Sequence, residues 1–382
     1  MTTTGITAAE TPTRALPRWA VFGVANLAVV AVLAVASWYL LADPTTSPWH
    51  LYPLPFNAAL FWAILFVVFV GFVCEFVGFD RLPQPARGLA LLASTAVFGI
   101  VATWVLAQGL GRIAPDFAAS RPGGLGYFSG ALFVLFGFGT WVMSVLNWRH
   151  WPWPQLGLRQ PLAGLCEIVA VAIPTIVLYL VIGLPAFSVH VRNPLMAGDT
   201  VLGWFYSIVV AVLITGQLLD DQPWQMLGRG RPGRVASVST IGNIALGTVL
   251  YFVFVQLTHL LVGARAAGDL GVGIHQFPAQ LGVCWAFWMI FWANAFENRP
   301  TSLGTIANAA IRLALTFVLA VATFELYYRF GARRILHEPA VAAGLSGNAL
   351  GFLDWAVLWT LFYVVGFQSY GLGRWAPAGT AD

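Results

Sequence analysis

The sequence predicts an all-α fold, a polytopic transmembrane helix bundle of about ten spans built from repeated two-helix hairpins. Of its 382 residues, 59% are hydrophobic and only 9% are charged, and the mean hydropathy is +0.79. A soluble domain carries about 25% charged residues, so most of this surface must face lipid. The apolar residues also fall into separate runs that approach the roughly 20 residues needed to cross a bilayer.

The runs place ten spans along the chain, with a polar tail at each end. The first run has 23 residues and no small-residue cleavage site, so it reads as a membrane span and not as a signal peptide. Residues 184–200 are expected to form a loop. We predict cytoplasmic tails at 1–18 and 374–382 and a single transmembrane domain at 19–373. The spans are 19–41, 57–79, 86–110, 126–147, 161–183, 201–220, 236–262, 277–297, 303–328 and 352–373.

The arginines indicate the orientation, because loops rich in basic residues remain on the cytoplasmic side. All 19 basic residues are arginine, which is typical of a GC-rich bacterial genome. With both termini inside, eleven arginines lie in cytoplasmic segments, seven lie outside and one lies within a span. We therefore expect a multi-pass protein of the bacterial inner membrane.

The even-numbered spans end in related segments, which indicates a repeated unit. In each, aromatic residues precede a polar or acidic residue, and most copies continue with Pro, Leu, Gly and Arg. Proline ends one helix and begins the next, whereas glycine permits a tight reversal. A period of about 70 to 75 residues suggests duplication, although short cytoplasmic hairpins could also converge on this composition. The segments are "CEFVGFDRLPQPARG", "VLNWRHWPWPQLGLRQPLAG", "QLLDDQPWQMLGRGRPG", "NAFENRPTSLG" and "GFQSYGLGRWAP".

Ionisable side chains within spans are costly and are therefore candidate functional residues. Arg312 lies nine residues into its span, about 13 Å deep at 1.5 Å per residue. It needs a partner, and we expect Glu75 or Glu167 to fill that role. An internal salt bridge is one interpretation, and contact with an anionic solute is the other. Asn243 belongs to the most polar span and is a further candidate for solute binding.

Two other acidic groups lie near span ends. Asp220, Asp221 and Glu297 are expected to form an acidic cluster on the cytoplasmic side. On the outer side, Glu325 and Asp354 adjoin three arginines, so we expect a surface ion cluster there. These arginines are Arg329, Arg333 and Arg334.

The sequence indicates neither a cofactor nor a metal site. The three cysteines all lie in predicted spans, and only His259 among the six histidines does. No HxxxH or HExxH spacing occurs, and no basic stripe suggests nucleic acid. The expected partners are the lipid bilayer and a small-molecule solute, while protein partners cannot be inferred.

These features favour a transporter or permease for a small anionic or amphipathic organic solute, with possible proton coupling. Arg312 would contact the solute, and Glu75 and Glu167 would be its partner carboxylates. The alternative is a membrane-embedded enzyme, or a non-catalytic subunit of one, acting on a lipid or isoprenoid. Its active groups would be Asp220, Asp221 and Glu297, because paired carboxylates can bind magnesium.

Overall fold

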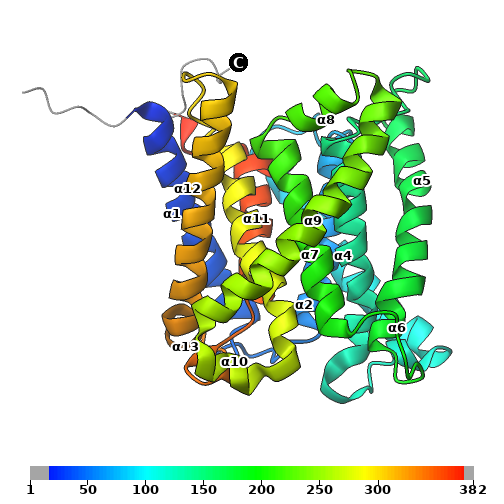
Figure 1. Ribbon diagram of the computed structural model, residues 1–382, viewed down its shortest axis with the longest axis vertical. Coiled ribbons are helices and arrows are strands. Elements are labelled where there is room, and N and C mark those ends of the chain that lie inside the picture. Colours follow the sequence, from blue (N-terminus) through cyan, green and yellow to red (C-terminus); the bar gives the residue numbers. More distant parts are fainter. Residues whose placement is uncertain (1–16, 374–382) are drawn as a thin grey trace, which may run out of the picture.

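The computed structural model describes residues 17–373 and confirms the all-α, polytopic helix bundle (Figure 1). Within those residues, nine helices are long and apolar enough to cross a membrane, and they match nine of the predicted spans. The tenth predicted span, 277–297, is α11, a helix of 19 residues. The ten long helices are α1 (Arg18–Leu41), α2 (Phe56–Val67), α3 (Ala86–Trp104), α4 (Leu125–Leu146), α5 (Leu162–Leu178), α7 (Gly198–Leu213), α9 (Pro232–Val262), α11 (Phe277–Ala295), α12 (Thr305–Leu326) and α14 (Ala349–Thr360).

Shorter elements extend or connect these helices. Six π-helical segments continue long helices: η1 (Val68–Val73), η2 (Val105–Gly109), η6 (Tyr179–Gly183), η7 (Ile214–Leu218), η9 (Tyr327–Gly331) and η10 (Leu361–Gly366). The short helices are η3 (Leu110–Arg112), η4 (Pro115–Phe117), η5 (Pro122–Gly124), α6 (Leu184–Phe187), α8 (Gln222–Leu227), α10 (Ala264–Leu270), η8 (Gly271–Gln276) and α13 (Ala332–Arg334). Strands β1 (Ala340–Ala342) and β2 (Leu345–Ser346) pair antiparallel. The expected loop 184–200 thus contains α6, and the two tails lie outside the described residues except for Pro17 and Arg18.

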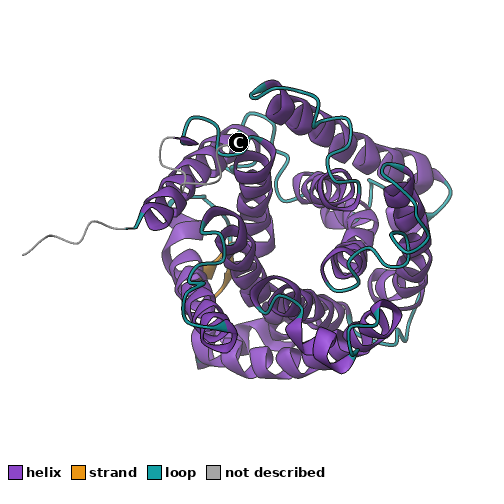
Figure 2. Ribbon diagram, turned by 90° about the horizontal axis from the view of Figure 1, so that it is seen from above, coloured by secondary structure: helices purple, strands orange, loops and turns teal. Residues whose placement is uncertain are grey.

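The long helices form an inner and an outer ring around one axis (Figure 2). Each of the inner helices α2, α4, α7, α11 and α14 packs against the next, and α14 closes the ring against α2. The outer helices α3, α5, α9, α12 and α1 pack on α2, α4, α7, α11 and α14, respectively.

Burial follows this arrangement. In the spans of α2, α4, α7 and α14, 61–78% of the residues are buried, against 22–28% in the outer spans. A helix that is apolar on all sides can be buried on all sides, whereas the outer helices present one face to lipid. The aromatic-rich, even-numbered spans of the sequence are therefore the inner helices.

Tryptophan hydrogen bonds connect the two rings. Trp204 of α7 donates its indole N–H to Thr248 of α9 at 2.9 Å, and Trp285 of α11 donates to Thr316 of α12 at 3.0 Å. Trp359 of α14 donates to Ser37 of α1 at 2.8 Å. A buried indole needs a partner for its N–H, so these bonds let large rings pack between the helices without an unpaired donor.

Five turns after the inner helices share one backbone geometry. Each contains two consecutive residues with φ between 51° and 61°, in the left-handed region that non-glycine residues rarely adopt. The second residue donates its N–H to the carbonyl six residues earlier, at 2.8–3.3 Å, which satisfies a carbonyl at the helix end. The duplication itself stays a prediction. The residue pairs are Glu75–Phe76, Arg149–His150, Asp220–Asp221, Glu297–Asn298 and Gln368–Ser369.

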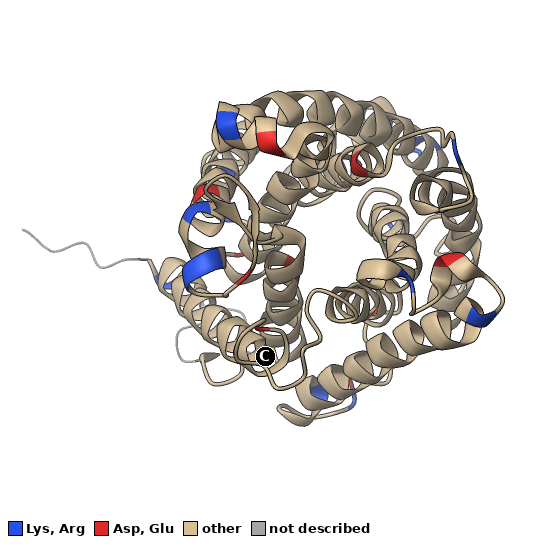
Figure 3. Cartoon of the chain, turned by 90° about the horizontal axis from the view of Figure 1, so that it is seen from below, with Lys and Arg blue, Asp and Glu red and all other residues tan. Residues whose placement is uncertain are grey.

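All five turns lie at the end of the bundle where α1 begins and η10 ends, at the top of Figure 1. We call this the terminal end and the other the distal end. Because the first helix begins and the last one ends at the terminal end, the chain crosses the bundle an even number of times, as predicted. Charged residues gather around the rim of the ring, as a view from the distal end shows (Figure 3).

Candidate functional site

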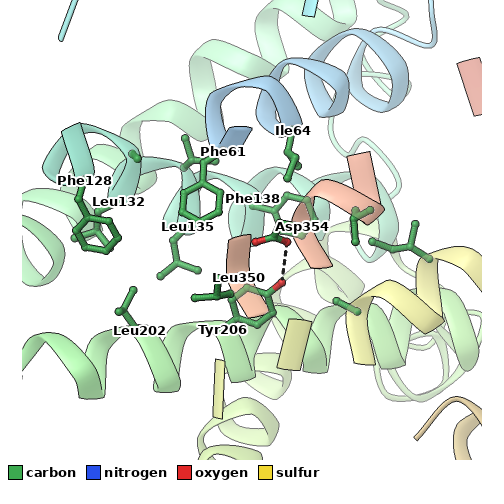
Figure 4. A pocket seen from close by; sticks show the side chains of 15 residues that line it. Phe61, Ile64, Phe128, Leu132, Leu135, Phe138, Leu202, Tyr206, Leu350 and Asp354 are labelled. Carbon is green, nitrogen blue, oxygen red and sulfur yellow. Dashed lines mark hydrogen bonds between the residues drawn. The ribbon is translucent and has the colours of Figure 1, made fainter. Parts of the chain in front are cut away.

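A cavity of about 60 Å³ lies inside the inner ring, with side chains from all five inner helices around it (Figure 4). Its wall is almost entirely apolar and includes Phe61, Phe128 and Phe138. The two polar exceptions are Asp354 of α14 and Tyr206 of α7. This volume accommodates about four to six water molecules, since one needs about 10–15 Å³.

Asp354 is the acidic group of this cavity, and the prediction that it joins a surface ion cluster is wrong. The residue is 8% exposed, and its carboxyl accepts one long hydrogen bond, 3.4 Å, from the Tyr206 hydroxyl. The residue lies five positions after the start of α14, about 7.5 Å along that helix. Figure 4 shows Phe61 and Phe138 on one side of the carboxyl and Tyr206 on the other. Of the predicted cluster, Glu325 and Arg329 do form an ion pair.

A second polar group lies beyond the cavity, at the distal end. Glu338 accepts hydrogen bonds from the hydroxyls of Tyr327 at 2.7 Å and Tyr52 at 3.0 Å, and from the backbone N–H of Asn348 at 2.7 Å. Burial raises the pKa of Glu338 to about 7, although these three donors oppose the shift. The group connects the segment before α2 to the end of α12 and the start of α14.

Arg312 does not contact Glu75 or Glu167, contrary to the prediction. Its guanidinium donates to Asp220 Oδ2 at 3.3 Å and to the carbonyl of Pro300 at 3.0 Å. The two partners differ in exposure, since the Arg312 side chain is 6% exposed and the Asp220 side chain is 58% exposed. The pair connects α12 to the turn after η7.

Glu167 instead bonds within its own hairpin. Its carboxylate accepts from Ser144 Oγ of α4 at 2.6 Å and lies 2.8 Å from His150 Nδ1 in the turn between α4 and α5. Burial lowers the pKa of His150, but the bond and the charge of Glu167 outweigh it and leave this pKa raised. Glu75, by contrast, is exposed in its turn.

Asn243 belongs to a buried network that joins three helices. Its amide donates to Asn147 Oδ1 at 3.0 Å, and its own oxygen accepts from Thr215 Oγ1 at 2.9 Å. Asn147 in turn donates to Asp221 Oδ1 at 3.1 Å. Gln225 also donates to Asp221, at 2.7 Å. Burial raises the pKa of Asp221, although these hydrogen bonds oppose the shift.

The three acids of the predicted cytoplasmic cluster have separate partners. Asp220 pairs with Arg312, Asp221 bonds to Asn147 and Gln225, and Glu297 pairs with Arg299 at 3.5 Å. The consecutive residues Asp220 and Asp221 thus bond to helices on different sides of their turn. Because the two aspartates have different partners, their arrangement does not support a shared magnesium site, on which the enzyme hypothesis depends.

Sequence reasoning missed the Asp354–Tyr206 pair, the Glu338 group and the role of His150. His150 could have been found, because it lies in the turn of a hairpin whose second helix carries Glu167 only 17 residues later. Tyr206 and Asp354 are 148 residues apart, and only closure of the ring brings them together.

Comparison of the chain with protein-family models, with curated proteins and with solved structures gave no match.

Proposed function

We propose that the protein is a membrane carrier for a small amphipathic organic cation, which Asp354 binds in exchange for a proton. The main support for this proposal is that the Asp354 carboxyl accepts only one, long hydrogen bond. Five carboxyl side chains are buried among residues 17–373, and each except Asp354 has at least two hydrogen-bonding groups around it. The other four are Asp43, Glu167, Asp221 and Glu338.

A buried carboxylate with one weak partner lacks the compensation that burial of a charge requires. A proton or a bound cation supplies that compensation. Ionisable residues that face the interior of a helix bundle are characteristic of ion and substrate pathways. Asp354 therefore fits a group that alternates between a protonated state and a cation-bound state.

The rest of the cavity wall supports a cation with an apolar body. Phe61, Phe138 and Tyr206 surround the carboxyl, and the negative faces of aromatic rings attract organic ammonium groups. The small volume favours a compact solute. This differs from the anionic solute that Arg312 suggested, because that guanidinium is engaged by Asp220 and Pro300. The solute-binding roles of Arg312, Glu75, Glu167 and Asn243 stay predictions.

The test uses three compounds of similar shape and different charge: tetramethylammonium, tert-butanol and pivalate. Thermal unfolding of the purified chain is measured with each. A ligand that binds only the folded state stabilises it by about 2.7 kcal/mol at a hundredfold excess over Kd. We expect tetramethylammonium alone to raise the unfolding temperature. In proteoliposomes with an internal pH dye, its uptake should be accompanied by proton release.

The decisive variant is Asp354→Asn, which keeps the size of the side chain and removes its charge. It should abolish both the stabilisation and the coupled proton movement. Glu325→Gln is the control, because Glu325 pairs with Arg329 outside the cavity and should leave both unchanged. Stabilisation by pivalate, or a tetramethylammonium effect that survives Asp354→Asn, contradicts the proposal. If none of the three compounds raises the unfolding temperature, the proposal is also contradicted, and a non-catalytic subunit becomes the favoured hypothesis.

A further inference from the structure

A smaller cavity, of about 40 Å³, lies inside the inner ring, nearer to its terminal end than the cavity around Asp354. We call it the terminal cavity and the one around Asp354 the central cavity. All five inner helices, or the π-helical segments that continue them, line both. The inner helices run toward the terminal end, and on α7 the lining passes from Tyr206 in the central cavity to Leu213 in the terminal one, about 10 Å along the helix. The two cavities are therefore stacked along the axis of the ring.

The side chains of Phe138 and Ile290 form the partition between these cavities, because both residues line both of them. Phe138 belongs to α4 and Ile290 to α11, and these two helices are not neighbours in the inner ring. The two side chains thus approach the axis from different sides. Each borders empty space in two directions and has room to change rotamer, unlike a side chain in a close-packed interior.

The wall of the terminal cavity suits an organic cation in passage. It is apolar apart from Gln217, and within residues 17–373 no ionisable side chain lines it. Phe72 and Phe138 contribute aromatic rings, whose negative faces attract ammonium groups. A cation is compensated less well here than beside the Asp354 carboxyl. Such a weaker site lets an ion leave, which passage through a membrane requires.

We propose that the organic cation moves between Asp354 and the terminal end along the axis of the ring, through the terminal cavity, and that Phe138 and Ile290 limit the size of the cation that passes. This inference rests on the proposed function, because it takes the solute and the carboxyl site from it. The carboxyl then selects the charge of the solute, whereas the partition selects its size.

The test compares uptake of tetramethylammonium and the larger tetraethylammonium into proteoliposomes that contain the protein. The wild type should take up tetramethylammonium faster. Ile290→Ala removes three carbon atoms from the partition. It should raise the ratio of tetraethylammonium to tetramethylammonium uptake about tenfold or more, because forcing extra methylene groups against a packed wall is costly. Phe138→Leu should raise this ratio as well. Tetramethylammonium should still raise the unfolding temperature of both variants, since Asp354 is unchanged.

Ile208→Ala is the matched control for Ile290→Ala. The two isoleucines are similarly buried, at 2% and 5% exposure, but Ile208 lies against Gly247 of α9 and lines neither cavity. The control should keep the uptake ratio of the wild type. Ile290→Val removes only one carbon atom, so it should raise the ratio less and it provides the test if Ile290→Ala does not fold.

The outcomes separate this inference from the proposed function. If the wild type neither binds nor takes up tetramethylammonium, the proposed function fails, and the route fails with it. If the wild type takes up tetramethylammonium but Ile290→Ala, Ile290→Val and Phe138→Leu all keep its uptake ratio, only the route through the partition is overturned. An equal rise in Ile208→Ala also overturns it, because general loosening of the bundle would then explain the result.

Discussion

Replacing Asn243 by alanine is expected to destabilise the protein by about 1.5–4.5 kcal/mol. The side chain is fully buried in α9. Its removal leaves Asn147 Oδ1 without its donor, and a buried, unpaired acceptor costs about 1–3 kcal/mol. The lost bond from Thr215 adds only about 0.5–1.5 kcal/mol, because the Thr215 hydroxyl can then donate its proton to the Ala211 carbonyl, 2.9 Å away.

The assay is thermal unfolding of the purified chain in detergent. One kcal/mol shifts the midpoint by about 2–4 °C in domains of 150–250 residues and by less in a longer chain, so we expect a fall of several degrees. Asn294→Ala is the control, because the Asn294 amide bonds only to Ile290 of its own helix. Asn147→Ala combined with Asn243→Ala should cost less than the sum of the two single changes, since both act on one network.

Either of two results would refute this reasoning. If Asn243→Ala unfolds at the same temperature as Asn294→Ala, the network does not stabilise the contact of α4, α7 and α9. Asn243 would then be available for the solute contact that the sequence suggested. A large loss of stability together with an additive double variant would also contradict the argument, because it would place the cost outside the Asn147–Asn243 bond.

Two further predictions concern charged groups at the two ends of the bundle. The folded-state pKa of Glu338, about 7, lies above its ordinary value of 4.5, so the folded chain binds an extra proton between these values. Stability should therefore fall as the pH rises from about 4.5 to 7, and Glu338→Gln should flatten this part of a plot of unfolding temperature against pH. At the terminal end, Asp220→Asn should lower the unfolding temperature more than Arg312→Met, because it leaves a buried guanidinium without a counter-ion. The opposite order would show that the exposed Asp220 contributes little to holding Arg312.

The spans and the turns were predictable because they depend on short stretches of sequence. An apolar run of about 20 residues identifies a span wherever it packs. The turns after the inner helices were visible as polar residues followed by Pro and Gly, since local backbone geometry selects these residues. The same locality explains the main error. Asp354 was assigned to a surface cluster because Arg329, Arg333 and Arg334 lie close to it in the chain.

Partners across the ring could not be predicted, since they depend on which helices become neighbours. The sequence suggested Glu75 or Glu167 for Arg312 because all three were expected within spans. In the ring, α12 packs beside η7, so the turn after η7 brings Asp220 to the guanidinium. The depth of a residue in the membrane is a local property, whereas its angular position around the ring belongs to the whole fold.

The α2–α14 contact separates the central cavity from a larger cavity of about 520 Å³ between the two rings, lined mainly by α1, α2, α3 and α14. Phe61 of α2 and Asp354 of α14 line the central cavity, whereas their chain neighbours Leu60 and Trp355 line the larger one. This contact joins the second long helix of the chain to the last one, so no hairpin turn holds it together. The shape of the cavity around Asp354, which all five inner helices line, therefore depends on closure of the ring and not on any one hairpin.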